Sequence, residues 1–461
     1  MGVLAWVSDK LWNPWLLGAF LLVGGYFTLR TGFFQLFSLP VWLRATLGRR
    51  KAGTKGKPGG LSQVQALSTA LASTIGTGSV AGVATAIFFG GPGAVFWMWV
   101  SAFLGMMTGF AEKALAVRYQ ESDGAGGLRG GPMCYMERGL GRTGKVLAAA
   151  FSFFCVLASL GGGAMVQANS IAAALHSAVG APELLTGLVT AALVGGVLLG
   201  GIGRVGRVSE KLVPAMALLF LGGGIWVIFV RRAALPEAFR LILESAVSPR
   251  AAMGGYGIGA AMRYGVARGV FTNEAGLGSS AIAHAAARAE HPAQEGMWGI
   301  FEVFAATMVV CTVTSLVILT SGVYDVSAAL DALASGAIPE GWIGAPLSGA
   351  AFGTVMGRLG PVFVAACLLL FAFPSLLGWG YYGERGLSYL LGGNRGRGLF
   401  RGLFLAAVVL GSVGGAAAVW QVSDLLNGLM ALPNLIALVL LSPQAVGLLQ
   451  DYLQRDTGRR G

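Results

Sequence analysis

The stretch Ala66–Gly105, ALSTALASTIGTGSVAGVATAIFFGGPGAVFWMWVSAFLG, decides the fold of this chain. It is long and apolar enough to cross a bilayer, since a spanning helix needs about 20 mostly apolar residues. Its centre, Ser73–Ser79 (STIGTGS), is rich in glycine and hydroxyl residues, which destabilise a helix interior. Unwound backbone at membrane depth is tolerated only where protein buries it or where it lines a cavity. We therefore predict a broken helix whose exposed amides and carbonyls bind a small polar molecule.

A second segment of the same kind lies in the other half of the chain. Within residues 266–282, the run Thr272–Ser280 (TNEAGLGSS) interrupts apolar sequence. It follows the first break by five predicted spans, so the second copy crosses the membrane in the opposite direction. Paired, glycine-interrupted segments are typical of inverted repeats that enclose a site at the membrane midplane. We predict repeat one at 61–230 and repeat two at 258–450.

The composition indicates an all-α polytopic membrane protein. Of 461 residues, 55% are hydrophobic and only 11% are charged, whereas soluble domains are about 25% charged. The 74 glycines suit membrane helices that approach one another closely. The net charge of +12 arises mainly in short loops between apolar segments. Such a pattern indicates orientation in the membrane, so we expect lipid contacts and no nucleic-acid partner.

About eleven transmembrane helices can be placed by hydrophobicity. They are expected near 14–30, 61–89 (broken), 94–118, 147–176, 183–201, 209–230, 258–285 (broken), 296–320, 356–390, 400–421 and 424–450. The remaining parts are an N-terminal region, 1–60, with one helix and a basic loop; a linker, 231–257, with an interfacial helix; and a tail, 451–461.

The distribution of cations predicts the orientation, because short cytoplasmic loops are enriched in Lys and Arg. The loop after the first span holds cations and no acid: Arg30, Arg44, Arg49, Arg50, Lys51, Lys55 and Lys57. The segment 321–352 holds acids and no cation: Asp325, Asp331 and Glu340. We expect a cell-membrane protein with its N-terminus outside and its C-terminus in the cytoplasm. The linker conflicts with this orientation, since it contains Arg231, Arg232, Arg240 and Arg250.

Three motifs resemble the sodium:alanine/glycine symporter family. They are Gly90–Gly105 (GGPGAVFWMWVSAFLG), Arg268–Ser279 (RGVFTNEAGLGS) and Gly378–Arg385 (GWGYYGER). The resemblance implies a leucine-transporter-type fold with five-plus-five inverted repeats and one extra N-terminal helix. It also implies cation-driven uptake of small amino acids, without a cofactor, by a protein that works as a monomer.

The first break suits a carboxylate. The amides of Gly76, Thr77 and Gly78 precede a half-helix that begins at Val80. A helix N-terminus carries about +0.5 charge and unpaired N–H groups, which favour an anion. A glycine-rich packing face is the alternative interpretation of these residues.

The second break suits an ammonium group. Thr272 and Asn273 offer carbonyls, a hydroxyl and an amide, and Gly276 lies in the same break. Glu274 needs an explanation, because a carboxylate at membrane depth is costly unless it is paired or faces water. It could bind the amides of its own break, contact the substrate, or carry a proton. These three roles remain open at the level of sequence.

Two further polar or aromatic positions lie within apolar spans. Gln167 and Asn169 are amides of the kind that hydrogen-bond a neighbouring helix. The family resemblance places Gln167 in the substrate cavity. Trp379 follows Pro374–Ser375; it is either an interfacial residue or, by resemblance, the wall that limits the size of the substrate side chain.

The resemblance also implies one sodium site. The carbonyls of Ala72 and Ile75 and the hydroxyl of Ser375 would hold the ion, and hard oxygen ligands suit an alkali cation. Pro374 stands where a hydroxyl is usual, and it frees a carbonyl one turn earlier because it lacks an N–H. Ser79 stands where asparagine is usual, so we expect the second ion site of this fold to be absent.

Other candidate residues are interpreted as structural. Three histidines near span ends show no metal-ligand spacing: His176, His284 and His291. The charged residues Glu112, Arg118, Glu384 and Arg385 are interpreted as pairs at cytoplasmic helix ends. The cysteines are scattered and predict no disulfide framework: Cys134, Cys155, Cys311 and Cys367.

The sequence therefore favours a secondary transporter that imports alanine or glycine with sodium by alternating access. A proton-coupled symporter is the main alternative, with Glu274 or Lys211 as carrier. An intramembrane enzyme is a weaker alternative, because Glu274 and Glu302 lie in different helices without a metal-binding partner motif. An ion channel fits the paired breaks poorly.

Overall fold

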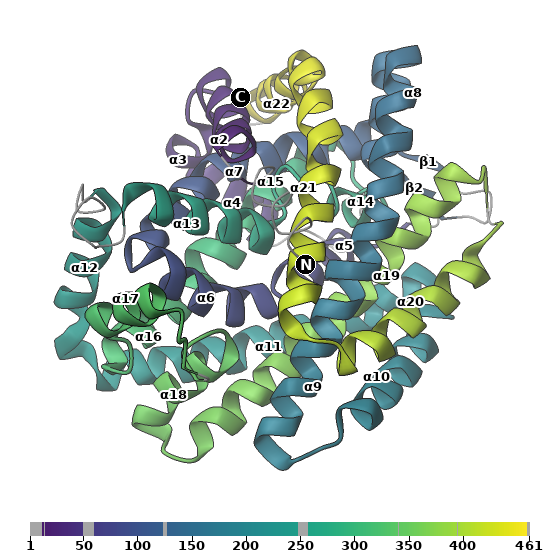
Figure 1. The fold of residues 1–461 in the computed structure, drawn as a ribbon. Coiled ribbons are helices and arrows are strands. Elements are labelled where there is room, and N and C mark those ends of the chain that lie inside the picture. The colour runs from purple at the N-terminus through teal and green to yellow at the C-terminus, as the bar shows by residue number, and fades with distance from the viewer. Residues whose placement is uncertain are drawn as a thin grey trace.

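The computed structural model describes Trp12 and residues 14–48, 60–122, 127–247, 257–339, 341–393 and 395–458. The described chain is almost entirely helical, apart from a short antiparallel pair, β1 (Glu121–Ser122) and β2 (Leu128–Arg129). Figure 1 shows the helices packed side by side, with α21 (Ala416–Leu440) crossing in front of the centre beside α8 (Pro132–Ala158). Most of the predicted basic loop, from Arg49 to Lys57, lies outside the described residues, as does Arg250.

The first predicted break is confirmed. Helix α5 (Gln63–Thr74) begins at a capping box in which Ser62 and Gln65 bind each other's backbone amides. It ends because Ile75 leaves the helical region (φ −84°, ψ 67°) and the next residue, Gly76, is extended. A single 3₁₀ turn, η1 (Thr77–Ser79), then leads into α6 (Ala81–Gly90). The backbone groups of the predicted break are thus released from regular helix.

The second predicted break is confirmed as well. Helix α13 (Ile258–Asn273) ends at Glu274, whose left-handed conformation (φ 55°) is unfavourable for a non-glycine residue. The chain then passes through Gly276 (φ 91°) and Gly278 (φ 81°), where a side chain would be strained. The second half-helix, α14 (Ala281–His284), has only four residues.

Long helices flank the two breaks. After the first come α7 (Gly93–Arg118), α8, η2 (Ser159–Met165), α9 (Val166–Val179), α10 (Glu183–Leu198) and α11 (Gly201–Val230). After the second come α15 (Pro292–Val303), η5 (Phe304–Cys311), α16 (Thr312–Ser321), α19 (Leu359–Leu390), α20 (Arg397–Val413) and α21. In the described ranges, six helices are long and apolar enough to cross a membrane, and shorter apolar helices include α2 (Pro14–Arg30), α6 and α10.

Several boundaries differ from the sequence prediction. The last span ends at Leu440, and a separate helix, α22 (Ser442–Gly458), follows. Pro443 lacks the N–H that a continuous helix would need at this point. The segment 321–352 contains two helices that were expected to be loop, α17 (Val326–Ser335) and α18 (Ala345–Met356). The π-helices η2 and η5, which interrupt two of the spans, were not predicted either.

The helix predicted in the linker forms over Leu235–Val247 (α12), after a 3₁₀ turn, η3 (Arg232–Ala234), and its place at the membrane interface stays a prediction. Arg240 bonds Glu237 at 2.6 Å and Glu244 at 3.4 Å. Acids of the same helix therefore neutralise one of the cations that conflict with the predicted orientation. Two more short helices, α3 (Phe34–Phe37) and α4 (Leu39–Leu47), follow the first span.

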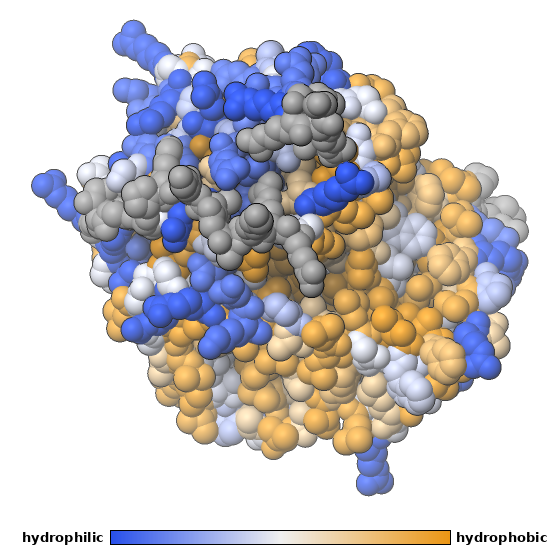
Figure 2. Space-filling view, turned by 180° about the vertical axis from the view of Figure 1, so that it is seen from behind, coloured by the Kyte–Doolittle hydropathy of each residue, from blue (hydrophilic) through white to orange (hydrophobic). Residues whose placement is uncertain are grey.

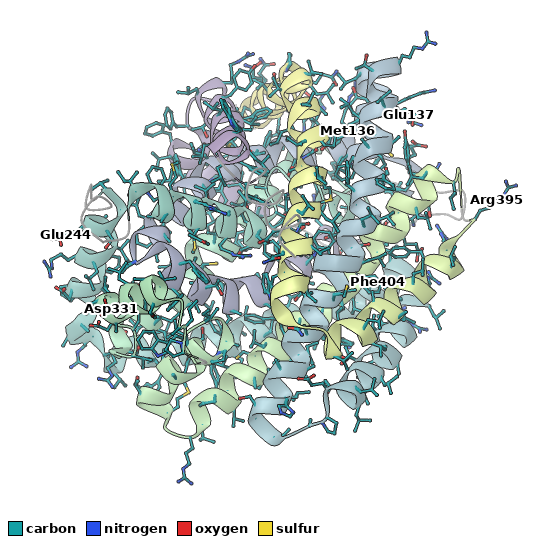
Figure 3. All side chains as sticks on the ribbon, viewed as in Figure 1. Met136, Glu137, Glu244, Asp331, Arg395 and Phe404 are labelled. Atoms are coloured by element: carbon teal, nitrogen blue, oxygen red, sulfur yellow. The ribbon has the colours of Figure 1, made fainter. Side chains whose placement is uncertain are left out.

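The surface separates into polar and apolar regions. Figure 2 shows hydrophilic side chains gathered over the upper part of this face and hydrophobic side chains over most of the rest. Large apolar residues are exposed on α10, α11 and α20, among them Leu193, Leu218, Trp226 and Leu403. In Figure 3 the side chains of Glu244 and Arg395 point outward at the left and right edges of the molecule. Exposed apolar faces on long helices are what a bilayer requires of a spanning protein.

Candidate functional site

A small enclosed cavity lies between the two breaks. Its volume, measured to the centre of a water-sized sphere, is about 10 Å³, the space of about one water molecule. The first and second breaks, η2, α9, α19 and α21 all contribute to its wall: Ser73, Thr74, Gly76, Gly78, Gly162, Gln167, Phe271, Glu274, Leu277, Trp379 and Asn427. Any larger molecule must push these side chains apart, so the structure shows the site in a contracted form.

Glycines allow the walls of the cavity to approach closely. A Cβ atom on Gly76 would lie 2.8 Å from the Ser375 hydroxyl oxygen. One on Gly163 would lie 2.5 Å from Cβ of Trp379. Such distances are shorter than carbon contacts permit. The first break is thus in direct contact with α19, and Trp379 is packed closely against Gly163 of η2.

Gln167 connects α9 to the first break. Its Oε1 accepts hydrogen bonds from the Thr77 hydroxyl at 3.2 Å and from the Thr77 amide at 3.5 Å. Its Nε2 donates to the Gly162 carbonyl at 3.5 Å. The residue lines the cavity and also satisfies unwound backbone. By contrast, Asn169 donates to the carbonyls of Gly411 and Gly414 and joins two helices.

The predicted sodium ligands Ala72 and Ser375 lie together. The Ser375 hydroxyl donates to the Ala72 carbonyl at 2.6 Å and also contacts the Phe371 carbonyl at 3.0 Å. Ile75 lies immediately after the end of α5. At Ser79, the carbonyl accepts a hydrogen bond from the Thr314 hydroxyl at 2.8 Å. The oxygens of Ala72 and Ser375 are therefore the close pair among the predicted ligands.

Three residues predicted in the second break do not line the cavity. The Thr272 hydroxyl donates to the Arg268 carbonyl at 2.8 Å. The Asn273 amide donates to the Thr307 hydroxyl at 3.1 Å and accepts from the Ala275 amide at 3.0 Å. The backbone amide of Gly276 donates to Glu112 at 2.9 Å. Their polar groups serve the break itself and the helices behind it.

Glu274 is buried and faces the cavity. Its Oε2 accepts a hydrogen bond from the Ser279 hydroxyl at 2.5 Å. Its backbone amide donates to the Val270 carbonyl at 2.8 Å and ends α13. The carboxylate is thus bound by a hydroxyl of its own break, a partner that none of the three roles considered from the sequence had named.

Several cavity residues were not predicted. Asn427 is an amide in the middle of an apolar span, the same signal that identified Gln167. Phe271 belongs to the motif Arg268–Ser279, but the sequence does not show which way the side chain of an aromatic residue beside a break points. Ser73 shares a hydrogen bond of 2.8 Å with the Tyr382 hydroxyl, which joins the first break to α19.

An ion pair and two aromatic rings lie beside the cavity wall. Arg268 donates to Asp424 from both terminal guanidinium nitrogens, to Oδ1 at 3.3 Å and to Oδ2 at 3.2 Å. Its guanidinium lies 5.0 Å from the ring centroid of Trp420, and this ring lies 5.6 Å from that of Phe271. The pair joins α13 to α21. Asp424 was not among the residues predicted for the site.

Glu112 was interpreted as one of a charged pair at a cytoplasmic helix end, and His284 was expected near the end of a span, where it closes α14. Both side chains are fully buried. Glu112 and its neighbour Lys113 belong to a charge cluster that continues through Glu302 to His284. The Glu384 carboxylate bonds two residues of the next helix, Arg401 at 2.7 Å and Arg397 at 3.3 Å.

The two broken helices around an enclosed cavity define a membrane transporter of the leucine-transporter-type fold. Two solved structures have the same fold. A manganese transporter of Eremococcus coleocola aligns with a TM-score of 0.54 and 16% identity over 87% of this chain and 83% of that one. MhsT, solved with L-phenylalanine, aligns with a TM-score of 0.52 and 16% identity over 84% and 90%.

The family model described as the sodium:alanine symporter family matches residues 1–460, so the chain belongs to that family. The sodium/alanine symporter AgcS of Methanococcus maripaludis is 42% identical over 95% of this chain and 93% of its own length. YrbD of Bacillus subtilis, whose name describes a sodium/proton-dependent alanine carrier, is 36% identical over 97% and 91%. The protein is therefore a transporter and not an enzyme.

Proposed function

We propose that this protein imports a small neutral amino acid, alanine or glycine, together with one sodium ion by alternating access. The observation that carries the proposal is the contact between the Ser375 hydroxyl and the Ala72 carbonyl, 2.6 Å apart behind Gly76. A carbonyl released by a helix break and a hydroxyl from a facing helix offer hard oxygens to an alkali cation at membrane depth. Ile75 supplies the third ligand in this proposal.

The substrate carboxylate binds to the amides of the first break. Gly76 and Gly78 line the cavity at the N-terminal end of α6, where the helix dipole favours an anion. Gln167 holds this backbone through Thr77. Trp379 is the wall that limits side-chain size, because it is packed against Gly163 and cannot retreat.

The substrate ammonium group faces the second break. Glu274 is the charged residue nearest to the ammonium group, since Glu274 is part of the cavity lining. The side chain of Asn273 is held by Thr307, so Asn273, Thr272 and Gly276 act through their backbone. In this proposal Glu274 contributes to charge balance in the cavity while Ser279 fixes its position.

The remaining features of the proposal follow the sequence prediction. The protein works as a monomer with two inverted repeats, 61–230 and 258–450. Its N-terminus lies outside the cell membrane, and its C-terminus lies in the cytoplasm. A single sodium site is proposed because the Ser79 side chain is shorter than the asparagine that is usual at this position.

Uptake of labelled alanine into proteoliposomes tests the proposal. An inward sodium gradient should drive accumulation, and equal sodium on both sides should give only equilibration. Excess unlabelled glycine should compete, whereas leucine should not. Accumulation driven by a pH gradient in sodium-free buffer would instead support proton coupling. The name of YrbD, a sodium/proton-dependent alanine carrier, describes this alternative.

A further inference from the structure

Five charged or titratable side chains are buried together beside the second break. Glu112 and Lys113 come from α7, Glu295 and Glu302 from α15, and His284 from α14; all five side chains have no exposed area. Lys113 Nζ lies 3.3 Å from Glu112 and 3.4 Å from Glu302. Burying charge requires partners that balance it. The number of protons bound to the cluster is therefore set by the need to balance its charges.

His284 lies between two carboxylates. Its Nδ1 is 2.8 Å from Glu295 Oε1, and its Nε2 is 3.1 Å from Glu302 Oε2. A neutral imidazole has one N–H and one lone pair, so one ring nitrogen would face a carboxylate oxygen without a hydrogen between them. An imidazolium donates from both nitrogens. This geometry favours the imidazolium.

The charge balance points the same way. Glu112 and Glu302 both pair with the ammonium of Lys113, and Glu295 adds a third carboxylate, beside His284. A cationic His284 brings the buried cluster closer to neutrality. Two amides donate to the carboxylates of the cluster: Gln63 Nε2 to Glu295 at 3.0 Å and Asn434 Nδ2 to Glu112 at 2.7 Å. The other titratable groups nearby are Tyr135, beside Glu112, and Tyr382, beside Glu274. Glu274 itself also lies near the cluster.

A metal ion is not the alternative occupant. Within the ranges that the structure describes, no group of three or more His, Cys, Asp or Glu side chains converges in the way metal ligands do. His284 is instead spaced for two separate hydrogen bonds on opposite ring nitrogens.

The cluster joins the ends of both broken helices. The segment after α14 pairs with the segment before α5, since the Leu61 amide donates to the Ala286 carbonyl at 2.8 Å and the Arg288 amide donates to the Leu61 carbonyl at 2.9 Å. Gln63, in the first turn of α5, bonds Glu295. Any movement that separates α14 from α15 must break the contacts of His284.

We propose that Glu295, His284 and Glu302 form a proton-binding site, and that the bound proton holds the ends of both broken helices together at this side of the transporter. Release of the proton removes one donor from the bridge and lets α14 move away from α15. The site does not depend on which amino acid or cation is carried, so it goes beyond the proposed function.

The charge state of His284 is tested in the wild-type protein. The chain has only three histidines, so ¹⁵N-histidine NMR should give three imidazole signals. His176→Gln and His291→Gln, which alter residues outside the cluster, assign the third signal by elimination. We expect that signal to be imidazolium at pH 8, where an ordinary histidine, with a pKa of about 6.5, is neutral. A neutral imidazole at pH 8 would overturn the proposal.

The consequence for transport is tested by the pH dependence of uptake at a fixed sodium gradient. In wild type, uptake should rise several-fold as the pH on this side is raised above 8, because His284 loses its proton there and the bridge opens. His284→Gln should give a flat profile, and His291→Gln should keep the wild-type profile. If His284→Gln does not fold, Glu295→Gln replaces it, since a glutamine can still accept a hydrogen bond from Gln63. The pH-dependent change in uptake should then occur at a lower pH, because His284 has lost one carboxylate partner. An unchanged profile in the folded variant contradicts the gating role.

Discussion

The hydroxyl oxygen of Ser375 lies 2.6 Å from the carbonyl oxygen of Ala72, across the interface between α19 and the first broken helix. The two residues are 303 positions apart in sequence. Because Gly76 has no side chain, the Ser375 hydroxyl reaches the released backbone directly. This contact carries the proposed sodium site.

Ser375→Ala should abolish sodium-driven alanine accumulation. The substitution removes one proposed ligand and leaves the Ala72 carbonyl without its partner. Wild-type uptake against sodium concentration should give a Hill coefficient close to one. The matched control is Ser315→Ala, because the Ser315 hydroxyl also bonds the carbonyl four residues earlier but lies away from the cavity. Equal sodium dependence in both variants would exclude the site.

Trp379→Ala should widen the substrate range to valine and leucine. Removing the indole enlarges a cavity that now holds about one water molecule. The change also costs about 3–5 kcal/mol of stability, so Trp379→Phe serves as the conservative control. Competition of unlabelled amino acids against labelled alanine measures the effect. If valine and leucine still fail to compete while alanine uptake persists, Trp379 is not the wall.

Gly163→Ala should lower uptake strongly. The new methyl group would lie 2.5 Å from Cβ of Trp379, so the indole or η2 must move into the cavity. Gly196→Ala is the control, because a Cβ there meets nothing within 4 Å and alanine favours the helix by about 1 kcal/mol. The initial rate of alanine uptake at matched protein amounts separates the two variants. Similar rates would contradict the tight contact.

Asp424→Asn and Arg268→Gln should each slow uptake several-fold. Either change leaves one partner of a two-bond ion pair unpaired between α13 and α21. The double variant should be no slower than the worse single variant, which shows coupling. Glu237→Gln with Arg240→Gln is the control, since exposed pairs contribute little, about 0–1 kcal/mol. Additive losses in the double variant would mean that the pair does not act as a unit.

Asp331→Cys should react with a membrane-impermeant thiol reagent only from outside, and Arg455→Cys only from the cytoplasm. Both positions are exposed, on α17 and α22. Three of the four native cysteines are buried, and Cys134→Ser removes the partly exposed one. Labelling of intact cells and of inverted vesicles distinguishes the two sides. The reverse pattern would invert the proposed orientation.

Local chemistry was sufficient to predict both breaks. Glycine and hydroxyl residues destabilise a helix interior, so the ends of α5 and α13 could be expected from their own sequences. Gln167 and Trp379 were placed at the cavity by their polarity or size together with the family motifs. The positive-φ glycines of the second break are local requirements of the same kind.

Partner choice was decided only by tertiary structure. Asn273 and Gly276 carry the expected polar groups, but Thr307 and Glu112, from other helices, bind them. Arg268 and Asp424 are separated by 156 residues, and His284 finds its carboxylates on α15. The residue types in the sequence show which polar groups need hydrogen-bond or ion-pair partners once water is excluded. Only the packing of helices distant in sequence determines which partner lies within hydrogen-bond reach, because the sequence of one helix does not show which face of another helix it meets.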